Sequence, residues 1–193
     1  MGNVYHTKDD MIDCVNAFYE GHGHTLGRNE TAPNYRTGEN YAYLGLAPQF
    51  LIFDEYVAFL EMLTTKESTA LLSQLKKIVM LGRQAGYFLI VACQRPDAKY
   101  FGDGIRDNFN FRVGLGRMSE LGYGMLFGSD VKKQFFQKRI KGRGYCDVGT
   151  SIISEFYTPL VPKGYDFLGT IRELTHIRQD GQVACEAKAT GTD

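Results

Sequence analysis

The residues best suited to chemistry are two acids that follow a short apolar run. Phe50 to Phe53 are apolar, and Asp54 and Glu55 come directly after them. A run of this length that stops at charged residues is typical of a strand in a parallel sheet, with both faces buried. A carboxylate fixed at a strand end can hold Mg²⁺, and a second one can orient or deprotonate a water molecule.

This arrangement has the form of a Walker B motif, in which the first acid serves the Mg²⁺ ion beside a nucleotide. A second strand-like run, Tyr87–Cys93, ends at Gln94-Arg-Pro96. If the two strands are neighbours, the Gln94 amide lies beside Asp54 and Glu55 and can contact a γ-phosphate or the attacking water. Two alternatives stay open at this point. The acids can cap a following helix, and the glutamine can cap a turn.

Three arginines are candidates for phosphate or subunit-interface contacts: Arg83, Arg112 and Arg117. An arginine that reaches the site from a neighbouring subunit can accelerate phosphoryl transfer by about 10³ to 10⁵. We favour Arg112, because it lies within the otherwise apolar strand expected near residues 110–115. Simple solvation at the surface is the alternative for each of the three.

A basic cluster interrupts an otherwise neutral chain, which has 22 Lys and Arg against 22 Asp and Glu. The cluster spans twelve residues without an acid and comprises Lys132, Lys133, Lys138, Arg139, Lys141 and Arg143. If all six contacted phosphates, the log–log salt slope of binding would be about −5. The cluster therefore suggests a surface that binds a polyanion through its phosphates, and a solvated basic helix is the alternative.

The remaining pattern alternates strands and helices. We expect helices over 9–19, from the Thr64-x-x-Glu67 capping box to Gly86, and over about 119–139, with late paired strands at 145–148 and 151–156. Gly21 and Gly23 should end the first helix, and 22–47 should form a polar connection in which His22 and His24 are loop residues rather than metal ligands. This order predicts an α/β fold with a mostly parallel sheet flanked by helices.

Composition narrows the class of protein further. Hydrophobic residues make up 44% and charged residues 23% of the 193 residues, which argues against disorder over most of the chain. The four cysteines are widely spaced and contain no C-x-x-C pair, so we expect reduced thiols in a cytoplasmic protein. No apolar run of transmembrane length occurs.

Several motifs together resemble the FtsK/SpoIIIE family of DNA translocases between about residues 50 and 150. The matching segments are Phe50-Leu-Ile-Phe-Asp-Glu55, Gly82-Arg-Gln-Ala-Gly86, Leu89-Ile-Val-Ala-Cys-Gln-Arg-Pro96, Ile105-Arg-Asp-Asn-Phe-Asn-Phe-Arg-Val113 and Lys141-Gly-Arg-Gly-Tyr145. The block from Gly82 to Pro96 is the most specific of them.

The resemblance implies a RecA-like P-loop ATPase that works as a hexameric ring, uses ATP and Mg²⁺, and pulls double-stranded DNA. It assigns Asp54 to the Mg²⁺ ion, Glu55 to catalysis and Gln94 to phosphate sensing. The absence of a winged helix after residue 170 favours the translocases of conjugative elements over those of cell division. Such proteins are cytoplasmic and often tethered to the inner face of the membrane.

One departure from the family is large, because the sequence contains no Gly-Lys dipeptide and hence no phosphate-binding P-loop. We therefore expect a domain truncated at its N-terminus, with residues 1–178 forming part of the motor and 179–193 a polar tail. Such a fragment should lack ATPase activity and self-associate through exposed sheet surface. The alternatives are part of a protein-secretion ATPase and a degenerate, non-enzymatic interaction module.

Overall fold

The computed structural model describes residues 4–31, 33, 36, 38–101, 104–131, 133–136, 139–150 and 152–176, and the side chains of 28–30 and 174–176 are not among the described parts. The chain divides into two units, one of residues 5–158 and one that joins residues 1–4 to 159–193. Helix α6 (Phe167–His176) belongs to the second unit. The predicted polar tail, 179–193, lies outside the described residues.

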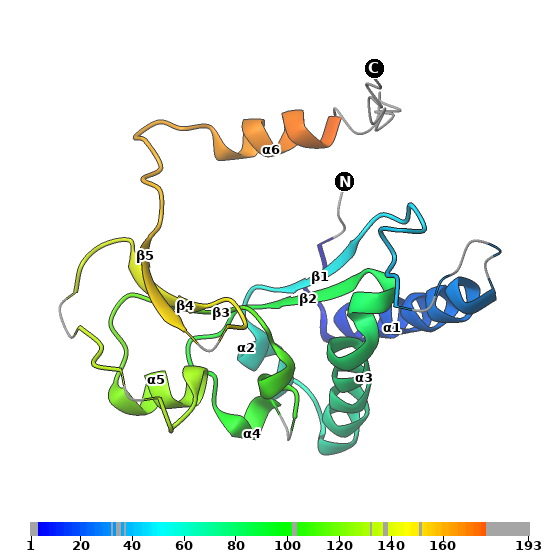
Figure 1. Ribbon diagram of the computed structural model, residues 1–193, viewed down its shortest axis with the longest axis horizontal. Helices are drawn as coiled ribbons and strands as arrows, with labels where there is room; N and C mark the ends of the chain where they lie inside the picture. Colours follow the sequence, from blue (N-terminus) through cyan, green and yellow to red (C-terminus); the bar gives the residue numbers. More distant parts are fainter. Residues whose placement is uncertain are drawn as a thin grey trace, which may run out of the picture. The chain divides into compact units, whose positions relative to one another are not determined.

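Two parallel strands stand at the centre of the larger unit (Figure 1). Strand β1 (Gln49–Phe53) pairs with β2 (Tyr87–Val91) in a register that runs from Gln49 opposite Tyr87 to Phe53 opposite Val91. The helices α2 (Tyr56–Glu61) and α3 (Thr65–Ala85) connect the two strands. The prediction that these strands are parallel neighbours is confirmed.

Helix α3 begins and ends at the residues that the sequence indicated. The Thr64 hydroxyl accepts from the Glu67 N–H, and the Glu67 carboxylate accepts from the Thr64 N–H, which completes the capping box. Gly86 ends the helix with φ 79°, a left-handed conformation that glycine adopts at low cost. Gly82 lets the helix lie close to β2, since a Cβ there would stand 2.1 Å from the Tyr87 carbonyl oxygen.

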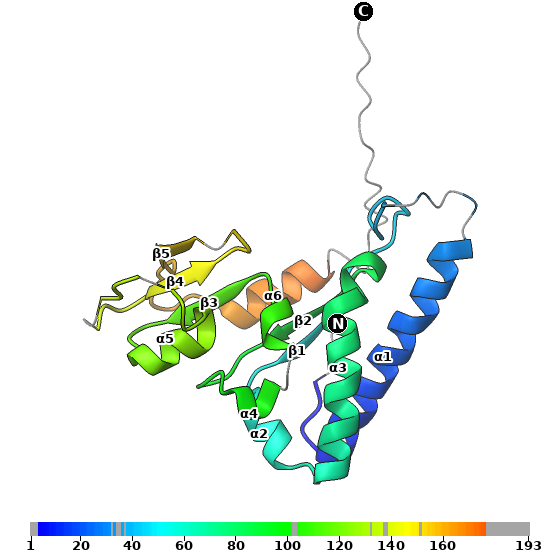
Figure 2. The same ribbon diagram turned by 60° about the horizontal axis from the view of Figure 1, so that its bottom comes forward.

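Helix α1 (Lys8–Thr31) is longer than predicted, and it runs beside α3 in the same direction (Figure 2). The expected ending at Gly21 and Gly23 is wrong. Gly21 instead receives the Tyr87 side chain, whose hydroxyl oxygen would lie 2.9 Å from an added Cβ. Packing against a distant strand therefore overrides the weak helix propensity of glycine.

The expectation that His22 and His24 lie in a polar loop is also wrong, because both are helical. His22 is only 2% exposed, and its ring packs edge-on against Tyr87 with centroids 5.7 Å apart. Burial lowers the pKa of His22, while a hydrogen bond with the Leu81 backbone opposes that shift. Among the described residues no group of three or more potential metal ligands is found.

The main hydrophobic core covers one face of the parallel pair. It draws buried residues from α1, α2, α3 and β1, among them Val15, Leu75 and Phe53. The opposite face carries Phe50, Ile52 and Ile90, which are 54%, 64% and 48% exposed. We expected both faces of β1 to be buried. Within the described part of the chain only one face is buried, so this expectation is wrong.

The second sheet is antiparallel, so the predicted mostly parallel sheet holds only for β1 and β2. Strands β3 (Arg112–Leu115), β4 (Arg143–Asp147) and β5 (Ile153–Tyr157) pair in sequence order. The late β4–β5 pair matches the prediction. The third strand, however, pairs with β4 in the described residues, and a Cβ added at Gly144 would stand 2.7 Å from the Gly114 carbonyl oxygen.

Helix α5 (Glu120–Phe127) packs on this antiparallel sheet and builds a second core with Tyr123, Phe127, Tyr145 and Ile153. Gly128 ends the helix with φ 111°. The predicted helix over 119–139 is thus correct only in its first part. Residues 133–136 and 139–140 are not helical, so the basic cluster is not a basic helix in its described part.

The remaining elements are short. Helix α4 (Ala98–Phe101) and the 3-10 helix η1 (Arg106–Asn108) link β2 to β3. Within the described ranges, no helix combines the length and the apolar character that crossing a bilayer would require.

Candidate functional site

The carboxyl ends of β1 and β2 meet at one edge of the parallel pair. Beyond the last paired residues, the Ala92 N–H donates to the Phe53 carbonyl at 2.8 Å, and the Tyr56 N–H donates to the Ala92 carbonyl at 2.9 Å. These two hydrogen bonds hold the segment with Asp54 and Glu55 against the end of β2. Ligands of parallel sheets bind at this edge.

Glu55 does not cap the helix that follows it. It occupies the N-cap position of α2, yet its side chain makes no capping hydrogen bond. Its Oε1 atom is buried and has no hydrogen-bond partner among the described residues. Asp54, one residue earlier, is exposed. An unpaired buried carboxylate oxygen is costly, so Glu55 fits a group that acts on a bound molecule better than a helix cap.

The thiol of Cys93, at the end of β2, lies near Glu55, at the end of β1. Nothing in the sequence indicated that Cys93 belongs to the site. The pKa of the Cys93 thiol is raised, first by partial burial and then by the nearby negative charge of Glu55. The thiol therefore stays protonated near neutral pH. Residue 93 directly precedes Gln94, so the Gln94 segment starts beside Glu55.

Gln94 is exposed, and another residue caps the turn that follows it. The Asp97 N–H donates to the Arg95 carbonyl at 2.9 Å, and the Asp97 carboxylate accepts from the Lys99 N–H at 3.1 Å. Asp97 thus takes the role that the alternative interpretation gave to Gln94. Within the described residues the Gln94 amide has no hydrogen-bond partner, which leaves it available to a ligand.

The strand-end residues fit part of a magnesium–nucleotide site. Mg²⁺ commonly uses one or two protein carboxylates together with waters and substrate phosphates, and Asp54 offers an exposed carboxylate for this purpose. Glu55 offers the unpaired oxygen that can accept a proton from water. A backbone cradle for phosphates is not encoded in these 193 residues, which lack a Gly-Lys dipeptide.

Arg112 is not brought to this edge by any contact of the described residues. Its guanidinium donates to the Leu126 carbonyl at 3.2 Å and pairs with Asp147 at 3.5 Å. The Asp147 side chain is 6% exposed, so the pair is largely buried. These contacts support a structural role in the antiparallel sheet. Arg83 and Arg117, the other two candidates, are exposed.

The basic cluster is divided by the structure, and Arg143 is its most buried described member. The Arg143 side chain is 8% exposed, with its Nε atom 2.6 Å from Glu155 Oε1. Its guanidinium also lies 4.2 Å from the centre of the Phe136 ring. This arginine therefore has little surface to offer a phosphate.

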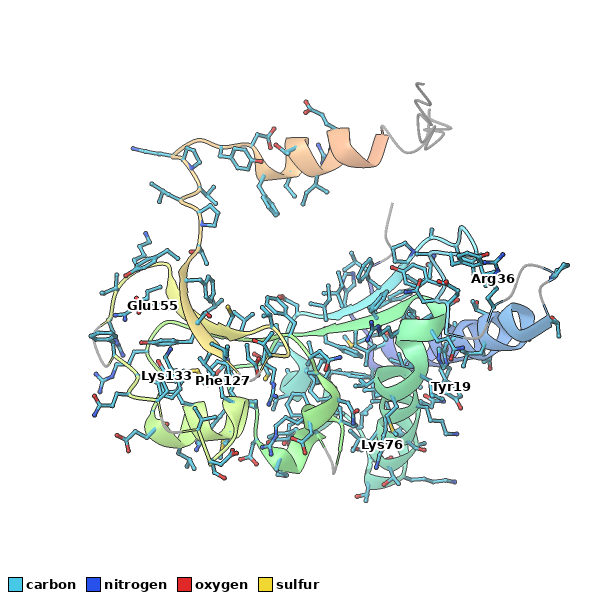
Figure 3. The ribbon with its side chains drawn as sticks, in the orientation of Figure 1. Tyr19, Arg36, Lys76, Phe127, Lys133 and Glu155 are labelled. Carbon is cyan, nitrogen blue, oxygen red and sulfur yellow. The ribbon has the colours of Figure 1, made fainter. Side chains whose placement is uncertain are left out.

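The other members of the cluster differ in their surroundings. Lys133 donates to the Ile153 carbonyl and lies over the Tyr145 ring, and its charge contributes to a lowered pKa of Glu155 (Figure 3). Arg139 and Lys141 are exposed. Lys132 and Lys138 lie outside the described residues.

A shallow hollow elsewhere in the larger unit contains none of the strand-end residues. It is lined by α1 alone, through Glu20, Gly23, His24, Gly27 and Thr31. Because this hollow is shallow and a single helix lines it, the strand ends remain the candidate site.

The fold is that of part of an FtsK-like ATPase domain. The chain superimposes on the conjugation coupling protein TcpA of pCW3, in its monomer form with ATPγS, with a TM-score of 0.67 and 18% identity over 90% of this chain and 51% of TcpA. The cytoplasmic domain of the type VII secretion ATPase EccC of Thermomonospora curvata gives a TM-score of 0.55 and 18% identity, over 82% of this chain and 19% of EccC. No family model matches the chain.

One curated relative is similar to the chain over nearly its whole length. The chain is 50% identical, over 190 residues and 98% of its length, to the FtsK domain-containing protein YdcQ of Bacillus subtilis strain 168. The chain is therefore a homologue of one part of an FtsK-domain protein, which confirms the resemblance found in the sequence. It spans 39% of the length of that relative.

Proposed function

We propose that this chain is one part of an ATP-driven motor that moves double-stranded DNA, and that its RecA-like core is completed by a P-loop outside these 193 residues. The observation that carries the proposal is the parallel pairing of β1 with β2, whose carboxyl ends carry Asp54, Glu55 and Gln94. The homology to an FtsK-domain protein and the ATPγS that accompanies TcpA in its solved structure support ATP as the nucleotide.

Each strand-end residue has a chemical role in this proposal. Asp54 supplies a carboxylate to the Mg²⁺ ion that accompanies ATP. Glu55 accepts a proton from the attacking water through its unpaired carboxylate oxygen. The Gln94 amide orients that water or contacts the γ-phosphate. Residues 1–178 would then form part of the motor domain, followed by the polar tail.

The relatives support a setting for the proposed motor. Because TcpA is a conjugation coupling protein, we favour transfer of conjugative DNA over cell division. We further propose a hexameric ring in the cytoplasm, connected to the membrane only through other parts of the protein. An arginine would act across the subunit interface, and Arg112 could do so only if it gave up its pairing with Asp147.

The DNA surface of this chain would rest on fewer cations than the sequence suggests. Arg139 and Lys141 are exposed, Lys133 is exposed but its ammonium contacts the Ile153 carbonyl and the Tyr145 ring, and Lys132 and Lys138 remain part of the proposal. Neutralising Arg139 and Lys141 should flatten the log–log salt slope by about 2, at roughly 0.9 per phosphate contact. Neutralising the buried Arg143 should instead destabilise the fold.

A second candidate function is transport of a polypeptide, as in a secretion ATPase. The burial of Arg143 and the pairing of Lys133 favour it, because they weaken the case for a DNA surface. A comparison of filter binding to duplex DNA and to an unstructured polypeptide separates the two cargoes. Salt-sensitive binding to DNA supports the first proposal, and binding only to the polypeptide supports the second.

ATP turnover of the full-length protein tests the main proposal. We expect turnover that duplex DNA stimulates, and we expect Glu55→Gln to lower kcat by about 10² to 10⁴, the range that general-base catalysis supplies. Glu39→Gln, which changes an exposed glutamate of the polar connection, is the matched control and should leave kcat unchanged. Full turnover in the Glu55→Gln variant would rule out the catalytic assignment.

A further inference from the structure

Tyr56 lies where the two strand-end segments can be fixed relative to each other. It follows Glu55 directly and is 1% exposed, one of the most deeply buried side chains among the described residues. Its N–H already bonds the Ala92 carbonyl beyond β2. Its ring packs between Phe53 of β1 and Phe101 of α4, with centroids 5.4 and 5.1 Å away.

The Tyr56 hydroxyl adds a polar contact to this packing. It donates to the Tyr100 carbonyl of α4 at 3.2 Å. The Tyr100 hydroxyl returns the contact by donating to the Glu61 carboxylate at the end of α2, at 2.6 Å. Helix α2 is thus joined to α4 by two tyrosine hydroxyls, and we call this arrangement the α2–α4 contact.

The position of the α2–α4 contact gives it a consequence for the site. Helix α2 starts one residue after Glu55, and α4 starts four residues after Gln94. Asp97 fixes the turn between Gln94 and α4 through two hydrogen bonds. Any movement of α4 relative to α2 would therefore change the distance between Glu55 and the Gln94 segment.

The hydroxyl of Tyr56 is suited to a permanent contact. Burial, assisted by the nearby Cys93, raises the pKa of Tyr56 well above its ordinary range, so the hydroxyl remains a neutral donor at every physiological pH. The aromatic contacts hold the Tyr56 ring in place. The hydrogen bond of its hydroxyl fixes the position of the Tyr100 carbonyl, and hence of α4, relative to that ring. A hydrogen bond of this kind contributes about 1 kcal/mol net.

We propose that Tyr56 is a positioning residue, which through the α2–α4 contact holds Glu55 and the Gln94 segment at a fixed separation without touching the nucleotide. This inference rests on the proposed function for its catalytic consequence. The separation itself is a property of this chain and can be measured without any enzymatic activity.

Alkylation of Cys93 reports on that separation. Cys93 starts the Gln94 segment, partly buried and near Glu55, and pulse labelling with iodoacetamide followed by peptide mapping measures its exposure. Tyr56→Phe should accelerate Cys93 labelling roughly three- to tenfold, the factor that corresponds to losing one hydrogen bond. Unchanged labelling of Cys93 would overturn the proposal.

Tyr123→Phe is a matched control in the second core. Tyr123 is also 1% exposed, and its hydroxyl also donates to a backbone carbonyl at 3.2 Å, that of Gly116. Tyr123→Phe should leave the rate of Cys93 labelling within about twofold of the rate in the unsubstituted chain. That change is smaller than the loss of one hydrogen bond at the site would give. Equal acceleration in both variants would show a general loss of stability and would also overturn the proposal.

ATP turnover of the full-length protein supplies the second readout. Tyr56→Phe should lower kcat about three- to tenfold with an unchanged KM for ATP, and Tyr123→Phe should change neither. If the parent protein shows no turnover, the proposed function fails, while Cys93 labelling still decides the role of Tyr56. If Tyr56→Phe does not fold, Tyr100→Phe takes its place, and unchanged Cys93 labelling in that variant contradicts the proposal.

Discussion

The parallel and antiparallel regions of the larger unit differ in whether their charged groups form ion pairs. In the antiparallel region, Arg112 pairs with Asp147 and Arg143 pairs with Glu155, although the buried Nε atoms of both arginines lack a hydrogen bond of good geometry. At the ends of β1 and β2, the carboxylate of Asp54 has no partner among the described residues, and Glu55 keeps a buried oxygen unpaired. Paired charges serve the fold, and unpaired charges at a strand end mark a place that a ligand completes.

The largest effect that we predict is a difference in ATP turnover between this chain and the full-length protein. The 193-residue chain should show no measurable ATP turnover, because it lacks the amides and the lysine that cradle phosphates. The full-length protein should turn over ATP. Both are measured by phosphate release under the same conditions, with the full-length Glu55→Gln variant as the background. Turnover by the chain alone, above that background, would contradict the division of the site.

The close approach of α3 to β2 predicts a large loss of stability on adding one methyl group. Gly82→Ala places a Cβ against the Tyr87 backbone, and such overpacking typically costs about 1 to 3 kcal/mol. Denaturant unfolding measures it. Gly23→Ala is the control, because an added Cβ there meets nothing within 4 Å. It should stabilise α1 by up to about 1 kcal/mol, and a Gly82→Ala variant as stable as this control would refute the packing described for α3.

The exposed face of the parallel pair predicts self-association of the isolated chain. Phe50, Ile52 and Ile90 present apolar surface that has no cover among the described residues. Sedimentation should show concentration-dependent oligomers that Ile52→Lys reduces. Ile152→Lys, at an equally exposed isoleucine of the antiparallel region, is the control. If the unsubstituted chain remained monomeric at every concentration, this prediction would be wrong.

Acid should reduce stability through one carboxylate in each region. The hydrogen bond from Lys8, followed by those from Thr64, lowers the pKa of Glu67 in the α3 cap to about 2. A carboxyl with a lowered folded pKa stabilises the fold above its ordinary value, near 4.5, and this contribution is lost as the pH falls toward 2. The pKa of Glu155 is lowered first by Arg143, with the same sign.

Thermal melting between pH 6 and pH 2 tests this linkage. The parent chain should lose stability over the window between the ordinary and folded pKa values of Glu67, and Glu67→Gln should be less stable at pH 6 and lose less on acidification. Parallel pH profiles of the parent and the variant would contradict the ion pair between Lys8 and Glu67. Because both groups are partly exposed, the effect should be the smallest of those described and should decrease with salt.

Local signals in the sequence were sufficient for the part of the fold that carries the candidate site. The capping box at Thr64, the glycine at position 86 and two apolar runs fix α3, β1 and β2 through contacts between near neighbours. Asp54, Glu55 and Gln94 could be assigned to one edge because parallel strands have their carboxyl ends together. Helix α2 was missed, since it starts directly after the strand without a capping side chain.

Features that depend on distant contacts could not be predicted. The path of α1 through Gly21 depends on Tyr87, 66 residues away, and β3 pairs with β4, a strand that α5 separates from it along the chain. The basic residues looked alike in sequence, although Arg143 is buried by Glu155 and Phe136. Tyr56 carried no chemical signal either, because its role arises from α4, which short-range patterns did not reveal.

A double-mutant cycle between the two strand ends tests the central claim most directly. Glu55→Asp and Gln94→Asn shorten the two side chains and should leave measurable ATP turnover in the full-length protein. Because both groups act on the same water, we predict that their effects on kcat are coupled by about 0.5 to 3 kcal/mol. Strictly additive effects would contradict the account, since they would mean that the ends of β1 and β2 do not serve one reaction.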